Sequence, residues 1–340
     1  MNVGIVGATG QVGTMMRRIL LERGFPVDSL RLFASSRSAG SSLEFEGQVI
    51  TVEDAASASF QGLDIVLFSA GASTAEQLAP KAARDGAIVI DNSSAWRMDP
   101  EVPLVVPEVN ADILRTLPKR IVANPNCTTM IVMSPLAALA QRFGLRRVIA
   151  STYQAVSGAG SAGVRELQDQ LSALELRASD LTFDGTAASS LVPSVFPRVI
   201  AANVIPMAGS WVDHETSEEK KFRNESRKIL GIPDLLVSVT CVRVPVFTGH
   251  SISLTVDLGK SFDLDEARFL IEGAYGMRPS EIPMPLGCVG GDVSLVGRVR
   301  SDDCFEHGLS FFVSGDNLRK GAALNAVQIA EELNRQFVEA

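Results

Sequence analysis

The stretch Val3-Gly4-Ile5-Val6-Gly7-Ala8-Thr9-Gly10-Gln11-Val12-Gly13 decides the fold of this chain. It reads as a short apolar strand over residues 2–6, a turn with glycine at every third position, and the start of a helix over residues 11–23. Such a turn lets the backbone approach a pyrophosphate, which the N-terminus of the helix stabilises. The stretch therefore predicts a dinucleotide-binding domain, although turns of this kind also serve packing alone.

The rest of the first 125 residues continues the alternation of strands and helices. Helical spacing is found at 73–85, and strand candidates are 30–34, 49–51, 64–68, 87–91, 104–106 and 120–123. This βαβ rhythm predicts an α/β fold with a doubly wound, mainly parallel sheet, Rossmann-like in its arrangement.

The residues after 126 read differently. Runs rich in β-branched residues are grouped with long polar helical stretches, at 146–156, 161–180, 216–230, 236–247 and 250–258. Elements in blocks indicate an α+β domain. The apolar spacing over 318–337 predicts a C-terminal helix that packs back on the first domain. We therefore divide the chain into a dinucleotide-binding domain of residues 1–126, completed by 318–340, and a second domain of residues 127–317.

Composition excludes several classes of protein. The chain has 340 residues and a net charge of −8, and it contains no basic run, so we expect no nucleic-acid partner. It has no 18-residue uncharged apolar run and opens directly into a strand, so we expect no membrane span, no leader and a cytoplasmic location. The four cysteines form no C-x-x-C pair and the three histidines are scattered, so we expect neither a metal site nor a disulfide framework.

The second strand indicates which dinucleotide is bound. NAD-binding folds usually end this strand with an acid that accepts the ribose 2′-hydroxyl. Here residues 30–34 run into Ser35-Ser36-Arg37-Ser38, which offers a guanidinium and three hydroxyls instead. These groups suit a 2′-phosphate and favour NADP, whereas the alternative is a solvated loop.

The stretch Asn124-Pro125-Asn126-Cys127-Thr128-Thr129 supplies a candidate nucleophile. A tight polar turn before a small and apolar run places Cys127 at the first turn of a helix, where the helix dipole favours the reactive thiolate. Free cysteines are usually small buried residues, and we give that interpretation to Cys241.

A candidate acid/base and several charged groups lie elsewhere in the chain. His250 follows Gly249 in a loop-like stretch, and unperturbed histidine has the near-neutral pKa that a general base needs. Arg243 lies seven residues earlier, so the chain must bend between them for both to face one pocket. Glu218 and Lys221 share one face of the 216–230 helix, although most such pairs are solvated. Arg97 follows the strand at 87–91, at the sheet edge where ligands bind.

With these pieces placed, the chain closely resembles aspartate-β-semialdehyde dehydrogenases over essentially its whole length. Seven ordered blocks carry the resemblance: residues 7–13, Asn92-Ser93-Ser94-Ala95-Trp96-Arg97, residues 124–129, Thr152-Tyr153-Gln154-Ala155-Val156-Ser157-Gly158-Ala159-Gly160, Thr216-x-Glu218-Glu219-x-Lys221, Arg243-x-Pro245-Val246-x-x-Gly249-His250, and Gly315-Asp316-Asn317-Leu318-Arg319-Lys320-Gly321-Ala322-Ala323.

The resemblance implies NADPH-dependent reduction of L-aspartyl 4-phosphate to L-aspartate 4-semialdehyde through a cysteine thioester, in biosynthesis of lysine (through diaminopimelate), methionine and threonine. It implies a homodimer that associates through the second domain. It also implies site roles: catalysis by Cys127, His250 and Gln154; substrate binding by Arg243, Glu218 and Gln154; phosphate binding by Arg97, Asn126 and Lys221; and NADP binding by Gly7, Thr9, Gly10, Gln11, Val12, Gly13, Arg37, Ser38, Ser157, Gly158 and Asn317.

Two departures and three rivals remain. Gln11 replaces the small residue of many members, and Lys220 beside Lys221 offers a second phosphate ligand. N-acetyl-γ-glutamyl-phosphate reductase shares the architecture, but its acylated substrate needs no carboxylate partner such as Glu218. Glyceraldehyde-3-phosphate dehydrogenase shares Cys-Thr-Thr but lacks the preceding Asn-Pro-Asn and usually prefers NAD. A non-catalytic paralogue that only binds nucleotide or a partner would have lost Cys127 or His250, and both are present.

Overall fold

The computed structural model describes residues 1–175 and 177–339, so Ala340, the last residue of the expected 318–340 segment, lies outside the described residues. The chain forms two compact units. Unit 1 comprises Met1–Ala138, Asn224–Asp234 and Leu318–Ala340, and unit 2 comprises Leu139–Arg223 and Leu235–Asn317. These bounds differ from the division at residue 126, because α4 (Cys127–Phe143) and α6 (Ser217–Leu230) each contribute residues to both units.

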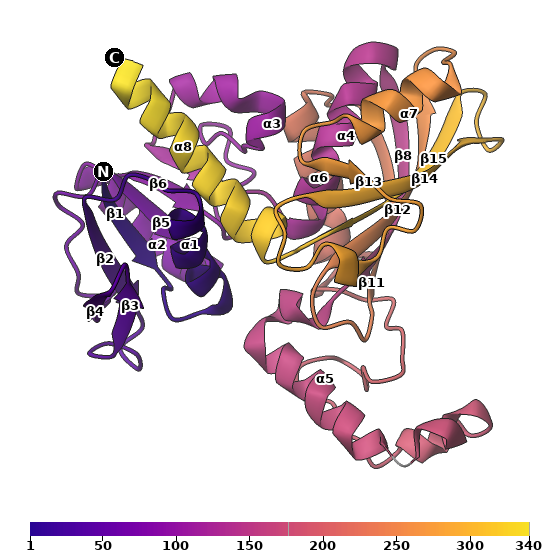
Figure 1. Ribbon diagram of the computed structural model, residues 1–340, viewed down its shortest axis with the longest axis horizontal. Helices are drawn as coiled ribbons and strands as arrows, with labels where there is room; N and C mark the ends of the chain where they lie inside the picture. The colour runs from indigo at the N-terminus through magenta and orange to yellow at the C-terminus, as the bar shows by residue number, and fades with distance from the viewer. Residues whose placement is uncertain (176, 340) are drawn as a thin grey trace. The chain divides into compact units, whose positions relative to one another are not determined.

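Unit 1 contains the doubly wound sheet that the glycine-rich stretch predicts (Figure 1). β1 is central and pairs in parallel with β2 on one side and β5 on the other, and only the β3–β4 pair is antiparallel. The strands, in spatial order, are β3 (Ser42–Phe45), β4 (Gln48–Asp54), β2 (Ser29–Ala34), β1 (Asn2–Val6), β5 (Ile65–Phe68), β6 (Ile88–Asp91) and β7 (Ile121–Ala123). The carboxyl ends of β1, β2, β4 and β5 therefore meet at one edge, where open α/β sheets bind ligands.

The C-terminal helix completes the core of unit 1. Leu324, Val327 and Leu333 of α8 (Leu324–Glu339) are buried in the same cluster as Met16 and Ile19 of α1 (Gln11–Glu22). Figure 1 shows α8, in yellow, beside the indigo and purple elements formed by the start of the chain. The remaining helices of unit 1 are α2 (Ala72–Arg84), α3 (Pro107–Asn110), the 3₁₀ turn η1 (Ala111–Arg115) and the π-helix η6 (Arg319–Ala323).

Two predicted elements are wrong in part. The strand expected at 104–106 is only a bridge from Leu104 to Ala123, because Pro107 starts α3 and the Val106 amide donates to the side-chain oxygen of Asn110 instead of to a strand. The helix expected at 161–180 is α5 (Gly160–Leu174), which ends in a tightened turn before the 3₁₀ helix η3 (Ala178–Thr182).

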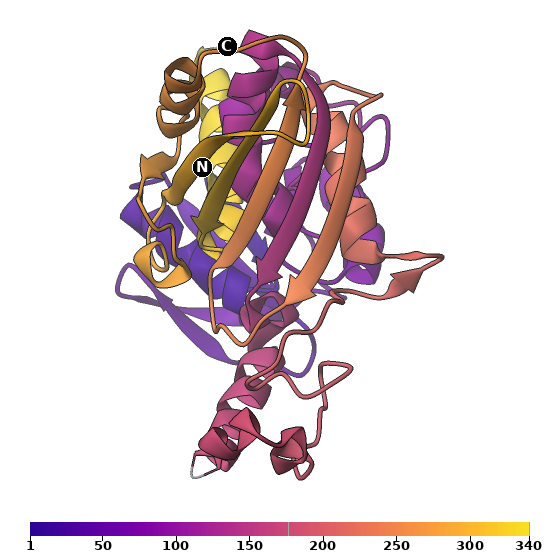
Figure 2. The ribbon, with the colours of Figure 1, turned by 90° about the vertical axis from the view of Figure 1, so that its right-hand side faces the viewer.

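Unit 2 is built on one mixed six-stranded sheet, which Figure 2 shows from its broad face. The strands, in spatial order, are β11 (Leu236–Arg243), β8 (Leu145–Gln154), β12 (His250–Leu258), β15 (Gly308–Gly315), β14 (Ser294–Asp302) and β13 (Met277–Pro279). The β8–β11 and β13–β14 pairs are parallel and the others are antiparallel, which confirms an α+β unit. The smaller elements are η2 (Val156–Ala159), η4 (Gly185–Ala188), β9 (Trp211–Val212), β10 (Glu215–Thr216), α7 (Leu264–Glu272) and η5 (Pro285–Gly287).

No helix of the described residues crosses the face of this sheet that Figure 2 turns to the viewer. On β8 the side chains alternate in burial, and the outward-facing Ile149 and Tyr153 are 45% and 39% exposed. The Tyr153 ring lies 6.0 Å from that of Phe312 on β15. Clustered apolar side chains on an open sheet face are typical of a protein–protein contact.

Candidate active site

The glycine-rich turn after β1 has the close contacts that a dinucleotide cradle requires. Gly7 has φ of +83°, and a Cβ there would lie 2.2 Å from the carbonyl oxygen of Ser69. A Cβ on Gly13 would lie 2.3 Å from the carbonyl oxygen of Gly7. Gly10 caps α1, and the first turn of this helix holds no acidic residue that could compete with an anion. Only glycine fits at Gly7 and Gly13, and the amides at the start of α1 are suited to a pyrophosphate.

A cavity of about 530 Å³ lies at the carboxyl edge of this sheet. Three of the predicted cofactor residues line it, and the complete lining is Val6, Gly7, Thr9, Gly10, Ala34, Ser35, Ser36, Asp54, Ala55, Ala56, Ser69, Ala70, Thr74, Gln77 and Leu78. The other predicted residues of the turn, at 11–13, form the first turn of α1. The cavity size and the glycine cradle fit a nicotinamide dinucleotide.

The predicted 2′-phosphate residues lie on the turn that follows β2. Arg37 is exposed and does not line the cavity, whereas its neighbours Ser35 and Ser36 do. The Ser38 amide donates to the carbonyl oxygen of Ser35, so the turn is folded back at the edge of the cavity. Asp54, at the end of β4, was missed because a sequence does not show that β4 pairs with β2.

Cys127 is the first residue of α4, as the Asn-Pro-Asn turn predicts. The side-chain oxygen of Asn126 accepts from the Thr128 amide at 3.0 Å and from the Thr128 hydroxyl at 2.5 Å, so Asn126 caps the helix. The Cys127 thiol is partly exposed and lies 3.9 Å from that oxygen. A 17-residue helix places the positive end of its dipole beside the thiol, which favours thiolate.

The other three cysteines lack this combination. Cys241 is fully buried on β11, as expected. Burial raises the pKa of the Cys288 thiol to about 11, and Cys304 is exposed beside Asp302, which raises its pKa. Of the cysteines in the described residues, only Cys127 is both partly exposed to solvent and placed at the start of a long helix.

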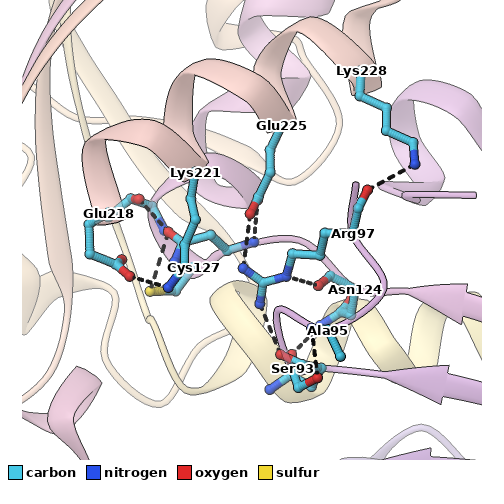
Figure 3. A network of polar contacts seen from close by, with 12 residues as sticks. Ser93, Ala95, Arg97, Asn124, Cys127, Glu218, Lys221, Glu225 and Lys228 are labelled. Atoms are coloured by element: carbon cyan, nitrogen blue, oxygen red, sulfur yellow. Dashed lines mark hydrogen bonds and ion pairs between the residues drawn. The ribbon is translucent and has the colours of Figure 1, made fainter. Parts of the chain in front are cut away.

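Arg97, predicted to bind phosphate, is buried in a network of hydrogen bonds (Figure 3). Its Nε donates to the carbonyl oxygen of Asn124 and its Nη2 to that of Asn92, each at 2.9 Å. Its Nη1 donates to a carboxylate oxygen of Glu225 at 2.9 Å. The other carboxylate oxygen of Glu225 accepts from the Asn126 amide at 2.6 Å. Sequence reasoning missed Glu225, because 128 residues separate it from Arg97.

In unit 2, three strand ends bring Gln154, Arg243 and His250 together. Arg243 pairs in register with Gln154 across β11 and β8, and His250 opens the adjoining β12. Residue Ala155 contacts two of them: its carbonyl oxygen accepts from Nη1 of Arg243 at 2.7 Å, and its amide donates to Nδ1 of His250 at 3.0 Å. The bend expected between Arg243 and His250 is therefore present, and both side chains converge near one residue.

His250 differs from its expectation in two ways. It is a fully buried strand residue rather than a loop residue, and its pKa is lowered to about 3 by burial and by the charge of Arg243, against the opposing effect of Glu218. Because Nδ1 accepts a backbone N–H, the proton of the neutral ring must lie on Nε2. In the part of the chain that the structure describes, this buried Nε2 has no partner, nor has Oε1 of Gln154. The geometry thus offers a neutral N–H donor instead of a base near neutrality.

The predicted cofactor residues of unit 2 surround the same histidine. A Cβ on Gly158 would lie 3.0 Å from Nη1 of Arg243 and 3.3 Å from Cε1 of His250, so a side chain at this position would crowd both. The side-chain amide of Asn317 donates to the Ser157 hydroxyl at 2.9 Å, and its oxygen accepts from the Gly249 amide at 2.8 Å.

On α6, Lys221 and Lys220 lie next to different carboxylates. The Lys221 ammonium lies 2.7 Å from a carboxylate oxygen of Glu218 (Figure 3), and both side chains are largely shielded from solvent. Lys220 points elsewhere, since it is exposed and its charge acts on Glu215. The two residues that the sequence could not separate therefore occupy different surroundings.

Comparison with known proteins decides the family. Residues 2–117 match the NAD binding domain of semialdehyde dehydrogenases, and residues 136–320 match their dimerisation domain. The chain is 59% identical to the aspartate-semialdehyde dehydrogenase of Streptomyces akiyoshiensis over 334 residues, which cover 97% of this chain and 98% of that protein. The chain belongs to the aspartate-semialdehyde dehydrogenase family.

Other members of the family agree with this placement. The aspartate-semialdehyde dehydrogenase of Mycolicibacterium smegmatis is 52% identical, with 98% of both chains covered. The crystal structure of aspartate semialdehyde dehydrogenase II from Vibrio cholerae, complexed with ASA, superposes with a TM-score of 0.91 at 39% identity and 98% coverage of both chains. Aspartate-semialdehyde dehydrogenases are NADP-dependent oxidoreductases of amino-acid biosynthesis, so the resemblance found in the sequence is confirmed together with its cofactor. None of the described helices is long and apolar enough to span a membrane.

Proposed function

We propose that the chain reduces L-aspartyl 4-phosphate to L-aspartate 4-semialdehyde with NADPH, through a thioester on Cys127. The observation that carries this proposal is the thiol at the capped start of α4. The Cys127 thiolate attacks the acyl carbon, the bond from that carbon to the phosphate oxygen breaks, and inorganic phosphate leaves. NADPH, when bound, supplies the hydride that reduces the thioester carbon.

The groups of unit 2 have roles that their chemistry supports. The Nε2–H of His250 donates a hydrogen bond to the oxyanion that hydride addition leaves on the thioester carbon, and it stabilises this oxyanion until the C–S bond breaks to give the aldehyde and the free thiolate. Being neutral, the ring needs no second proton to act in this way. The Gln154 side chain orients the substrate beside the thiol. Arg243 binds the substrate α-carboxylate with its planar fork, and Glu218 binds the ammonium.

Phosphate binding is assigned to Arg97, Asn126 and Lys221. The Lys221 ammonium is held by Glu218 at 2.7 Å, so one ion pair joins the proposed phosphate and ammonium ligands. The remaining assignments concern NADP, which we place on the cavity of unit 1 with Arg37 and Ser38 at its 2′-phosphate, and on Ser157, Gly158 and Asn317 at its reactive end.

We further propose that two copies associate through the open face of the unit 2 sheet and act in the cytoplasm. The outward-facing Ile149 and Tyr153 support this, as does the match of this region to a dimerisation domain. The mass of the particle in solution, from light scattering, should be twice 36.2 kDa or a multiple of that, and Tyr153→Asp should lower it.

The decisive experiment measures NADP reduction in the presence of inorganic phosphate, with aspartate semialdehyde and N-acetylglutamate semialdehyde as alternative substrates. We expect turnover with the first only. Mass spectrometry of protein mixed with aspartyl phosphate, without NADPH, should locate the acyl adduct on Cys127. Turnover of the second aldehyde would favour an N-acetyl-γ-glutamyl-phosphate reductase. An adduct on Cys241, Cys288 or Cys304 would overturn the thioester assignment.

A further inference from the structure

We infer that Glu225 is a positioning residue that fixes the Cys127 turn and the Arg97 guanidinium with one carboxylate. The inference rests on the proposed function, because it assigns both groups to the same reaction. Glu225 itself touches neither the thiol nor a substrate in the geometry described above, so it acts through its two neighbours.

Both oxygens of the carboxylate are engaged by these two partners. The Glu225 side chain is 1% exposed, and each oxygen accepts one bond: Oε1 from Arg97 and Oε2 from the Asn126 amide. The bond to the amide is the shorter, at 2.6 Å. A charge-assisted bond to a backbone N–H fixes a main-chain position more tightly than a neutral one does. Cys127 is the next residue, so the position of its Cα follows from this bond.

Arg97 binds the same Asn124-Pro125-Asn126 turn at its other end. Its Nε bond to the Asn124 carbonyl oxygen means that Asn124 and Asn126 are both fastened, one by the guanidinium and the other by the carboxylate. The described contacts use three of the five guanidinium N–H donors and leave two for an anion. A phosphate bound there would meet an arginine whose plane is already set by Glu225.

A second charged residue of α6, Lys228, also binds the loop that contains Arg97. One helical turn after Glu225, the Lys228 ammonium donates at 2.8 Å to each of three carbonyl oxygens, those of Arg97, Asp99 and Val102. Figure 3 shows the first of these bonds. The Lys228 side chain is half-buried, and this burial lowers its pKa. Glu225 thus binds the Arg97 side chain and the turn before Cys127, while Lys228 binds the backbone of the loop after β6.

Loss of the carboxylate should therefore have a kinetic signature. A buried ion pair often stabilises a fold no more than apolar residues of the same volume would, so stability alone is weak grounds for its presence. In Glu225→Gln the amide can accept only one of the two bonds and presents an N–H₂ group to the other donor. Either the turn or the guanidinium must move, so thiol reactivity and phosphate affinity should change together.

The test compares Glu225→Gln and Glu225→Asp with Asp257→Asn. Asp257 is also a buried carboxylate paired with an arginine, 3.5 Å from Arg147, but it lies at the end of β12 away from His250. Two assays are run on each full-length variant. The first gives kcat and the phosphate KM for NADP reduction with aspartate semialdehyde, and the second gives the rate of Cys127 carboxymethylation by iodoacetate, with the adduct located by mass spectrometry.

We expect Glu225→Gln to lower kcat/KM for phosphate by about 100-fold, the scale of a 1 Å misplacement of reacting groups, and to change the carboxymethylation rate at least several-fold. Glu225→Asp, which keeps the charge, should recover at least about tenfold of that loss. Asp257→Asn should stay near wild type in both rates.

Wild-type rates in Glu225→Gln, or equal losses in Glu225→Gln and Asp257→Asn at equal folded fraction, would overturn the inference. If Glu225→Gln does not fold, Glu225→Asp decides, because a folded variant with wild-type kinetics would refute a positioning role and a raised phosphate KM with altered carboxymethylation would support it. An inactive wild type would refute the proposed function instead, while the carboxymethylation rates would still test the turn.

Discussion

An alanine in place of Gly321 would put a methyl group against the proposed nucleophile. Gly321 lies in the π-helix η6, and a Cβ there would be 2.9 Å from Cβ and 3.3 Å from Cα of Cys127. Carbon atoms pack at about 3.5–4.0 Å, so one of the two backbones must retreat by roughly 0.6–1.1 Å. π-Helical turns are frequent at functional sites, and here the turn brings a glycine against the start of α4.

The two expected effects have opposite signs and can be separated. Gly→Ala at a compatible helical position stabilises by about 0.4–1 kcal/mol, whereas overpacking costs about 1–3 kcal/mol. We therefore expect a net loss of roughly 1–2 kcal/mol in the free energy of unfolding, measured with urea. Displacing the thiol by about 1 Å should lower kcat/KM of phosphate-dependent NADP reduction by up to ~100-fold.

Gly185→Ala is the matched control. This glycine lies in the 3₁₀ turn η4, has no positive φ, and a Cβ there would meet nothing within 4 Å. Gly185→Ala should leave the free energy of unfolding and kcat/KM near the wild-type values. If Gly321→Ala keeps kcat/KM within twofold of wild type and unfolds no earlier in urea, the contact does not fix the thiol and the reasoning is refuted.

Three further predictions concern the cofactor, the histidine and the anion ligands. Arg37→Ala should weaken NADP binding by about 1.5 kcal/mol, the lower limit for a bond to a charged group because Arg37 is exposed, and should leave NAD binding unchanged in fluorescence titrations; equal weakening of both would contradict it. The folded-state pKa of His250 lies near 3, below the usual 6.5, so the unfolded chain binds the extra proton between these values and stability should fall as pH falls through that range. The urea midpoint of wild type should exceed that of His250→Asn most at high pH, and the difference should shrink as pH falls toward 3. If the two plots of midpoint against pH stay parallel, the lowered pKa of His250 is refuted. Lys221→Ala should raise the phosphate KM and spare NADP, whereas Arg243→Lys should lower kcat/KM for the aldehyde despite the retained charge; an unchanged phosphate KM in the first would make Lys220 the candidate.

Local signals in the sequence predicted the parts of the fold that local chemistry determines. The strand, glycine turn and helix over residues 2–23 follow from short-range spacing, and so does the placement of Cys127 after an Asn-Pro-Asn cap. β14 and β15 were missed, although β15 lies between β12 and β14 in the sheet. The two are consecutive strands that pair with each other, but Gly297, Arg298 and Arg300 interrupt the apolar pattern of β14 where the register of the pair shifts.

The chemistry of the site was less predictable than its residues. The sequence named His250, but its near-neutral pKa assumed exposure, and the sheet that buries it is formed by strands from across the chain. Glu225 carried no signal, because an acid on a polar helix is ordinary until its partners are known. The same holds for Gly321, whose closeness to Cys127 spans nearly 200 residues of sequence.

The closing of unit 1 by α8 has a consequence for how the protein is made. Leu324, Val327 and Leu333 belong to the same buried cluster as side chains of the first helix, so this cluster stays incomplete until the end of the chain has been synthesised. Roughly 180 residues separate Ala138 from Leu318, and at about 5–20 residues per second a ribosome needs on the order of 10–40 s to cross them. During that time the N-terminal segment exposes the apolar surface that α8 later covers, which makes the nascent chain a substrate for chaperones and makes premature termination near residue 318 a route to aggregation.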